Sequence, residues 1–199
     1  MNNLDKIYKK SIDFPAYASD YLKYLNEITK SIDLNVLNKI VVELIGVQER
    51  GGIVYFIGNG GSASIASHFA NDFLAGLRSR VNFKAISLCD NQSLITAIAN
   101  DYGFEYIFSH QITNIVNPSD LVMGLSVSGN SKNIIMGLNE AKRKGAKTIS
   151  ISSFGGGKVK EIADTALLIP ALHGEYGPAE DVFMILDHLI SSYLYRYYE

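Results

Sequence analysis

The sequence has little of what would mark several classes of protein. Its only cysteine is Cys89, so no internal disulfide can form and nothing requires an oxidising compartment. No apolar run reaches the roughly 20 residues that a membrane-spanning helix needs. The first residues also lack the basic-then-apolar pattern of a secretory signal. We therefore expect a cytoplasmic protein without a membrane partner.

Positive charge is equally scarce. The 18 lysine and arginine residues are outnumbered by 20 aspartate and glutamate residues, and they are scattered along the chain. Because proteins that bind nucleic acid usually present a basic face, we expect no nucleic-acid partner. A small anionic ligand is still compatible with the net charge of −2, since backbone dipoles can hold an anion locally.

Apolar residues, by contrast, are plentiful. They make up 47% of the 199 residues, which suits one domain with a large core. From residue 14 to residue 49 they recur every three or four positions, which predicts two helices. The break between these helices falls at residues 31–33, where Asp33 can cap the second one.

From residue 50 onward, short strands alternate with helices. Apolar runs predict strands at residues 53–57, 84–88, 121–125, 148–151 and 166–169. Helices are predicted at residues 63–77, 92–100, 106–116, 132–144 and 179–197, with Gly145 ending the fourth. This alternation predicts an α/β fold with a parallel sheet covered by helices on both faces, whose ligands bind at the carboxyl ends of the strands. No linker or internal repeat divides the chain, so residues 1–199 are predicted to form one domain.

Two loops rich in glycine and serine follow the first and third predicted strands, at residues 58–62 and 126–131. Their glycines let a ligand approach the backbone closely, and the helix that follows each loop begins with unpaired amides. Hydroxyl donors would come from Ser62, Ser126, Ser128 and Ser131. Either loop alone could be a plain strand-to-helix turn, but two at one sheet edge favour a phosphate site.

Nucleotide-binding patterns do not fit these loops. The first loop departs from G-x-G-x-x-G because Ala63 occupies the sixth position, and Asp90 lies beyond the place of a ribose-binding acid. Neither loop is followed by the lysine of the Walker pattern.

Two pairs of histidine and carboxylate residues lie on predicted helices. His68 and Asp72 are four residues apart, while Glu180 and His188 are eight apart, so each pair can share a helix face. Such pairs suit a divalent metal such as zinc, and they equally suit general acid–base catalysis. Each pair alone could be an ordinary surface ion pair, and the sequence does not show that the two meet.

Together these segments resemble the sugar isomerase, or SIS, domain family, and within it most closely the bacterial phosphoheptose isomerases. The resemblance extends over nearly the whole chain. Its most specific segments are residues 58–62, 68–70, 97–104 and 126–131, with a weaker match at residues 180–182 and His188.

The resemblance implies a doubly wound, flavodoxin-like fold with a parallel five-stranded sheet and two extra N-terminal helices. It also implies a homotetramer with active sites between subunits, in which residues 1–50 take part in oligomer packing. The implied reaction is the aldose–ketose isomerisation of sedoheptulose 7-phosphate to D-glycero-D-manno-heptose 7-phosphate. This reaction would supply heptose for lipopolysaccharide or capsule.

The family's site residues can be carried over position by position. One Zn²⁺ per site would be held by His68, Asp72, Glu180 and His188, with Asp72 as the catalytic base and His188 as its acid–base partner. The implied substrate-binding residues are Asn59, Gly60, Gly61, Ser62, Asp90, Ser126, Val127, Ser128, Ser131 and Glu180.

Several positions depart from the family's pattern. Asp72 replaces a longer glutamate, so it would reach the substrate through a metal, a water or a shifted helix, or would not reach it. Glu180 replaces a neutral amide, which would strengthen metal binding, or produce repulsion without a metal. Gly76 stands where many members have an arginine, for which Arg78 is the candidate substitute. Residues 172–177 are also unusual, so His173 and Glu175 could contact a different sugar.

Two alternatives to the heptose isomerase therefore stay open. One is a non-catalytic SIS-domain protein that binds a sugar phosphate or a protein partner. The other is an isomerase of another ketose phosphate.

Overall fold

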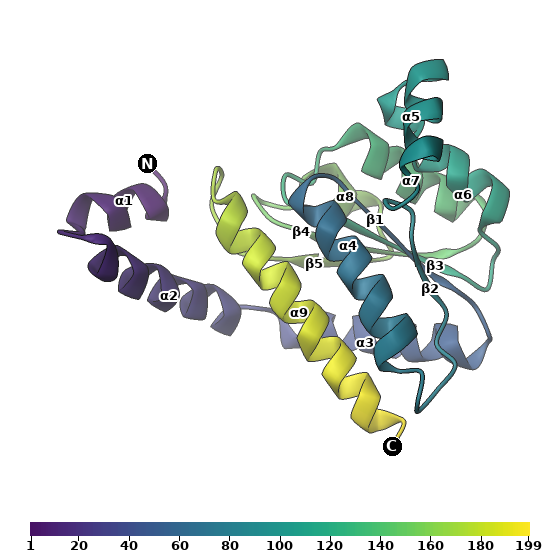
Figure 1. The fold of residues 1–199 in the computed structure, drawn as a ribbon, viewed down its shortest axis with the longest axis horizontal. Coiled ribbons are helices and arrows are strands. Elements are labelled where there is room, and N and C mark those ends of the chain that lie inside the picture. The colour runs from purple at the N-terminus through teal and green to yellow at the C-terminus, as the bar shows by residue number, and fades with distance from the viewer.

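Five short apolar runs form the strands of one parallel sheet in the structure, a computed structural model that describes residues 1–199 (Figure 1). The strands are β1 (Val54–Gly58), β2 (Ala85–Ser87), β3 (Leu121–Ser126), β4 (Lys147–Ser152) and β5 (Thr165–Leu168). All neighbouring pairs are parallel, and the spatial order is β2-β1-β3-β4-β5. This confirms the doubly wound α/β fold with five strands.

The sheet is buried on both faces because successive side chains of a strand point to opposite sides. Val54 and Phe56 of β1 belong to one core cluster, whereas Tyr55 and Ile57 belong to the other. The first cluster contains side chains from α3 (Leu34–Glu49), α4 (Gly61–Asn71) and α9 (Tyr176–Tyr197). The second contains side chains from α5 (Gln92–Asp101), α6 (Ser109–Ile115), α7 (Lys132–Arg143) and α8 (Gly157–Ile162).

The N-terminal helices end where the sequence predicts. Helix α2 (Phe14–Lys30) and helix α3 are separated at residues 31–33, and the Asp33 side chain accepts hydrogen bonds from the backbone of Asn35 and Val36. A further helix, α1 (Asn3–Lys10), precedes them and begins with a capping box of Asn2 and Asp5. Helices α1 and α2 project from the sheet domain beside the start of α9 (Figure 1).

Other elements differ from the prediction in their detail. The helix expected at residues 63–77 is α-helical only to Asn71 and continues as a π-helical segment, η1 (Asp72–Gly76). The helix expected at 106–116 begins as a 3₁₀ turn, η2 (Phe104–Tyr106), before α6. Gly145 ends α7 as predicted, with φ of 81° and a bond from the Ala146 amide to the Ala141 carbonyl. None of the helices is long and apolar enough to cross a membrane.

Candidate functional site

The two glycine- and serine-rich loops lie side by side because β1 and β3 are neighbouring strands. Gly58 at the end of β1 is opposite Leu125 near the end of β3, so both loops leave the same edge of the sheet. They surround a pocket of about 320 Å³. Its lining residues are Asn59, Gly60, Gly61, Ser62, Leu125, Ser126, Val127, Ser128, Ser131, Tyr176 and Glu180. All the predicted substrate-binding residues except Asp90 thus line one cavity.

The pocket is built to receive an anion. Helix α4 follows Gly60, which has no side chain, and helix α7 follows Ser131, whose side chain makes no capping bond. The first two amides of each helix, at residues 61–62 and 132–133, therefore keep their hydrogen-bonding capacity at the positive end of the helix dipole. Ser126 and Ser131 add hydroxyl groups whose oxygens lie 3.4 Å apart.

A pair of asparagine side chains joins the two loops. The amide of Asn59 donates to Asn133 at 2.9 Å, and the amide of Asn133 donates back at 2.7 Å. Asn133 is buried in α7. The Asn59 side chain therefore holds the loops in register, and Asn133 is a part of the site that the sequence analysis did not single out.

Glu180 lies at the phosphate pocket, whereas Asp90 lies outside its lining. Glu180 reaches the start of α4, where Ser62 Oγ lies 3.4 Å from its Oε1. A side chain at position 61 would overlap the Glu180 carboxylate, so Gly61 makes room for it. Asp90 instead accepts hydrogen bonds from Ser67 and Ser87, on the β2 side of α4.

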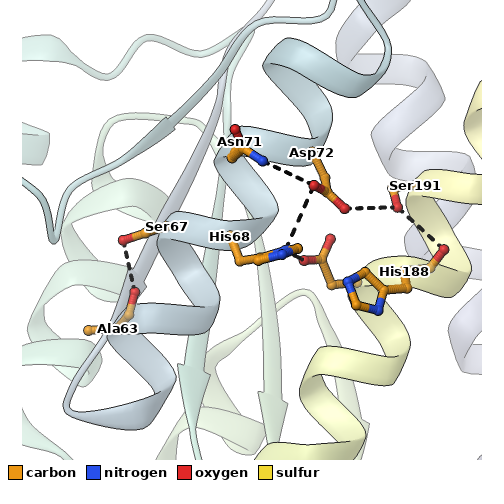
Figure 2. A network of polar contacts seen from close by, with 8 residues as sticks. Ala63, Ser67, His68, Asn71, Asp72, His188 and Ser191 are labelled. Carbon is orange, nitrogen blue, oxygen red and sulfur yellow. Dashed lines mark hydrogen bonds and ion pairs between the residues drawn. The ribbon is translucent and has the colours of Figure 1, made fainter.

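Helices α4 and α9 run side by side in the same direction, which brings the histidine–carboxylate pairs together. The contacts Ser62–Glu180, His68–Asp187 and Asp72–Ser191 follow one another along the two helices. Figure 2 shows His68 and Asp72 facing His188 and Ser191 across this junction. In consequence, ligand atoms of His68, Asp72, Asp187 and His188 all lie within 4.8 Å of one another.

Three of the four predicted metal ligands therefore meet, but Glu180 does not join them. Eight residues of helix separate Glu180 from His188, which is about 12 Å along the axis. Glu180 lies at the phosphate pocket, and Asp187 takes the fourth place in the cluster. The expectation that Glu180 completes this cluster is corrected for the single chain.

Asp187 is the residue of this site that the sequence analysis missed. Its side chain is fully buried, with Oδ2 at 2.7 Å from His68 Nδ1 and with no hydrogen-bond partner for Oδ1. Burial raises the pKa of Asp187 to about 6, against the lowering effect of His68 and with a further rise from Asp72. The available signal was a carboxylate among the buried apolar positions of α9, between Phe183 and Ile190.

Asp72 and His188 flank the cluster on its exposed side. Asp72 begins the π-helical segment, with Oδ1 at 3.8 Å from His68 Nδ1 and Oδ2 at 3.5 Å from Ser191 Oγ. The His188 ring lies 5.1 Å from the His68 ring, measured between centroids. Because π-helical turns often mark functional sites, the local shift of the helix at Asp72 is consistent with a role in the site.

A second cavity, of about 390 Å³, opens beside this cluster. It is lined by Asp72, Gly76, Leu77, His188, Ser191, Ser192, Tyr195 and Arg196. Arg196 is the cation on its wall, whereas Arg78 is exposed and absent from the lining. In the single chain, Arg196 rather than Arg78 lines the cavity to which Gly76 contributes.

In the unusual segment before α9, residues 172–177, Glu175 and His173 have different surroundings. Glu175 is fully buried and accepts hydrogen bonds from Asn3, Tyr24 and Leu172, so it holds the N-terminal helices and is unavailable to a sugar. The expectation that Glu175 could contact a sugar was therefore wrong. His173 is exposed and packs on Phe154, which in turn contacts Tyr176 of the phosphate pocket.

The cluster of His68, Asp72, Asp187 and His188 suits a divalent metal. Two imidazoles and two carboxylates are ligands that Zn²⁺ and similar cations accept. The unpartnered oxygen of Asp187 supports this fit, since a buried carboxylate normally has a partner for each oxygen.

The sequence is similar to a known family and to several known proteins. The family model for the SIS domain matches residues 16–153. A probable phosphoheptose isomerase of Thermoplasma volcanium is 35% identical over 90% of this chain and 91% of its own length. A phosphoheptose isomerase of Helicobacter pylori is 35% identical over 90% of this chain and 94% of its own.

The fold is also similar to solved structures of phosphoheptose isomerases. A phosphoheptose isomerase from Neisseria gonorrhoeae is 26% identical, with a TM-score of 0.81 over 90% of this chain and 95% of its own. One from Francisella tularensis is also 26% identical, with a TM-score of 0.84 over 98% of this chain and 100% of its own.

Proposed function

The chain belongs to the SIS domain family and to its phosphoheptose isomerases, and we propose that it converts sedoheptulose 7-phosphate to D-glycero-D-manno-heptose 7-phosphate. The proposal rests on one observation: helix α4 contributes residues to both the phosphate pocket and the metal cluster. The phosphate pocket surrounds its first turn, while His68 and Asp72 stand at its end. A substrate bound by its phosphate can therefore extend along α4 toward acid–base groups.

We assign the proton transfers to Asp72 and His188. Asp72 takes the proton from carbon 1 of the ketose while the carbonyl oxygen on carbon 2 gains a proton, which yields the cis-enediol. Return of a proton to carbon 2, with loss of the proton from the oxygen on carbon 1, gives the aldose. His188 moves the oxygen protons because its imidazole can both donate and accept near neutral pH.

The phosphate pocket and Glu180 would hold the sugar in place for these transfers. Amides at the starts of α4 and α7 would bind the phosphate. Glu180 lines the same pocket, where its carboxylate can accept hydrogen bonds from sugar hydroxyls beyond the phosphate.

Zinc is the proposed cofactor, one ion per site. His68 would hold it, with Asp72 and His188 as further ligands in the states in which neither carries a proton. When bound, a divalent cation supplies positive charge that polarises the carbonyl oxygen.

We also propose that the protein is a homotetramer and that it acts in the cytoplasm. Its product would be used to make a surface glycan such as lipopolysaccharide or capsule. Exposed apolar side chains support association of subunits: Ile185, Leu189, Tyr193 and Tyr197 recur every four residues along α9. Leu189 and Tyr193 also line an apolar groove with Leu34 and Val41 of α3. We assign residues 1–50 to the same packing.

The test is an assay of the purified protein supplied with Zn²⁺. We expect interconversion of the two heptose 7-phosphates, followed by NMR, and exchange of the proton on carbon 1 with solvent deuterium. A panel of ketose phosphates with five, six and seven carbons should give the highest kcat/KM for seven. Exchange with another sugar alone would indicate the other isomerase, and no exchange with any sugar would indicate a binding protein.

A further inference from the structure

We propose that Asp187 is a direct ligand of the metal site, together with His68, Asp72 and His188. The inference rests on the proposed function only in that the metal would serve the isomerase. It concerns a residue for which the sequence analysis assigned no role.

The first argument is the position of Asp187. Its carboxylate lies among the donor atoms of the other three residues, all within 4.8 Å of one another. Two of these residues come from α4 and its π-helical extension, and two come from α9, so the cluster bridges both helices. An ion held by all four would cross-link the two helices on which the site is built.

The second argument is the unpartnered oxygen. Asp187 is fully buried, and its Oδ1 has neither a hydrogen-bond partner nor exposure to solvent. A carboxylate in that position is unfavourable unless a cation or a donor completes its coordination. His68 supplies one partner, to Oδ2. A divalent ion would satisfy the remaining oxygen.

The competing explanation is a buried ion pair, in which Asp187 only orients the His68 ring. The two roles differ in the metal-loaded protein. Removal of a ligand changes the set of atoms around the ion and hence the spectrum of a bound Co²⁺, whereas removal of a residue that only orients His68 weakens binding and leaves the ligand set unchanged.

The experiment compares Asp187→Asn and Asp187→Leu with wild type by calorimetric titration with Zn²⁺ and by thermal unfolding with and without Zn²⁺. The amide of Asp187→Asn keeps an oxygen that can accept from His68, and leucine removes it. Asp181→Asn is the matched control, because Asp181 is a carboxylate of α9 that binds Tyr21 instead. The control should bind Zn²⁺ like wild type.

We expect wild type to bind one Zn²⁺ per chain and to melt at a higher temperature with the metal. Both Asp187 variants should bind it more than about 100-fold more weakly, beyond the roughly 10- to 100-fold that loss of an orienting partner costs, and lose this increase in melting temperature. The visible spectrum of the Co²⁺-loaded protein should also change in Asp187→Asn, since the ligand set is altered.

Three results would overturn the assignment: Zn²⁺ affinity in Asp187→Asn equal to that of wild type, a Co²⁺ spectrum that is unchanged in Asp187→Asn, or a wild-type protein that binds no divalent metal. None of them depends on heptose turnover. A protein whose metal binding requires Asp187 but which does not isomerise heptose phosphates would refute the proposed function and leave the metal site standing.

Discussion

Asp72 and His188 are the two residues on which the proposed chemistry depends most. Both line the cavity beside the metal cluster, and neither contributes to the phosphate pocket. Loss of either should therefore affect the proton transfers far more than phosphate binding. This separation distinguishes a chemical role from a general loss of structure.

We predict that Asp72→Asn and His188→Ala each lower kcat about 10²- to 10⁴-fold, the usual contribution of general acid–base groups. Affinity for inorganic phosphate, measured by competitive inhibition or calorimetry, should stay within a few-fold of wild type. His110→Ala is the control, since His110 packs against Tyr102 and Tyr106 away from the site. Unchanged turnover in both variants would remove these roles.

At the scale of elements, the phosphate pocket depends on how closely its loops pack. Gly129 of the second loop has φ of 68°, and a side chain there would overlap the carbonyl of Gly156 at the start of α8. The Val159 amide also donates to the Gly129 carbonyl. The loop after β3 is thus pressed against the loop after β4, and both lie at the carboxyl edge of the sheet.

We predict that Gly129→Ala lowers the free energy of unfolding by about 2–4 kcal/mol and weakens phosphate binding, because strain and a backbone overlap act together. Gly155→Ala is the matched control. Gly155 also has a positive φ, of 90°, but has open space around it, so its replacement should cost only about 1 kcal/mol. Urea unfolding measures both. Equal losses in the two variants would show that packing against Gly156 is unimportant.

For the whole molecule, the apolar stripe along α9 is the feature that a single chain does not explain. Leu189 and Tyr193 are about half exposed, yet they lie on the helix that also carries the site residues Asp187 and His188. Subunits associated through this stripe would stabilise the helix that positions the chemistry. Assembly and activity should therefore depend on each other.

We predict that Leu189→Glu lowers the mass of the assembly in sedimentation and light-scattering measurements, because a buried charge is costly at an interface. Leu94→Glu, at an exposed leucine of α5 on the opposite face of the sheet, is the control and should leave the mass unchanged. If Leu189→Glu has the mass of wild type, this stripe is not the interface.

The sequence by itself determined the alternation of strands and helices, the parallel sheet and the two anion-binding loops. These depend on local patterns: the buried runs of β1 and β3, the glycines after them, and the capping of α3 by Asp33. The loops meet because parallel neighbouring strands end at one edge. Helix α1 and the π-helical turn at Asp72 were not predicted, since tertiary packing influences segments so short.

Only the tertiary structure decided which side chains of α4 and α9 meet. Spacing along one helix shows that His68 and Asp72 share a face, but it contains no information on the register of a second helix beside them. The parallel register of α4 and α9 places Glu180 at the phosphate pocket and Asp187 against His68. Packing also buries the Asp187 carboxylate away from water and leaves one of its oxygens without a partner. Asp187 therefore joins the cluster only in the folded chain.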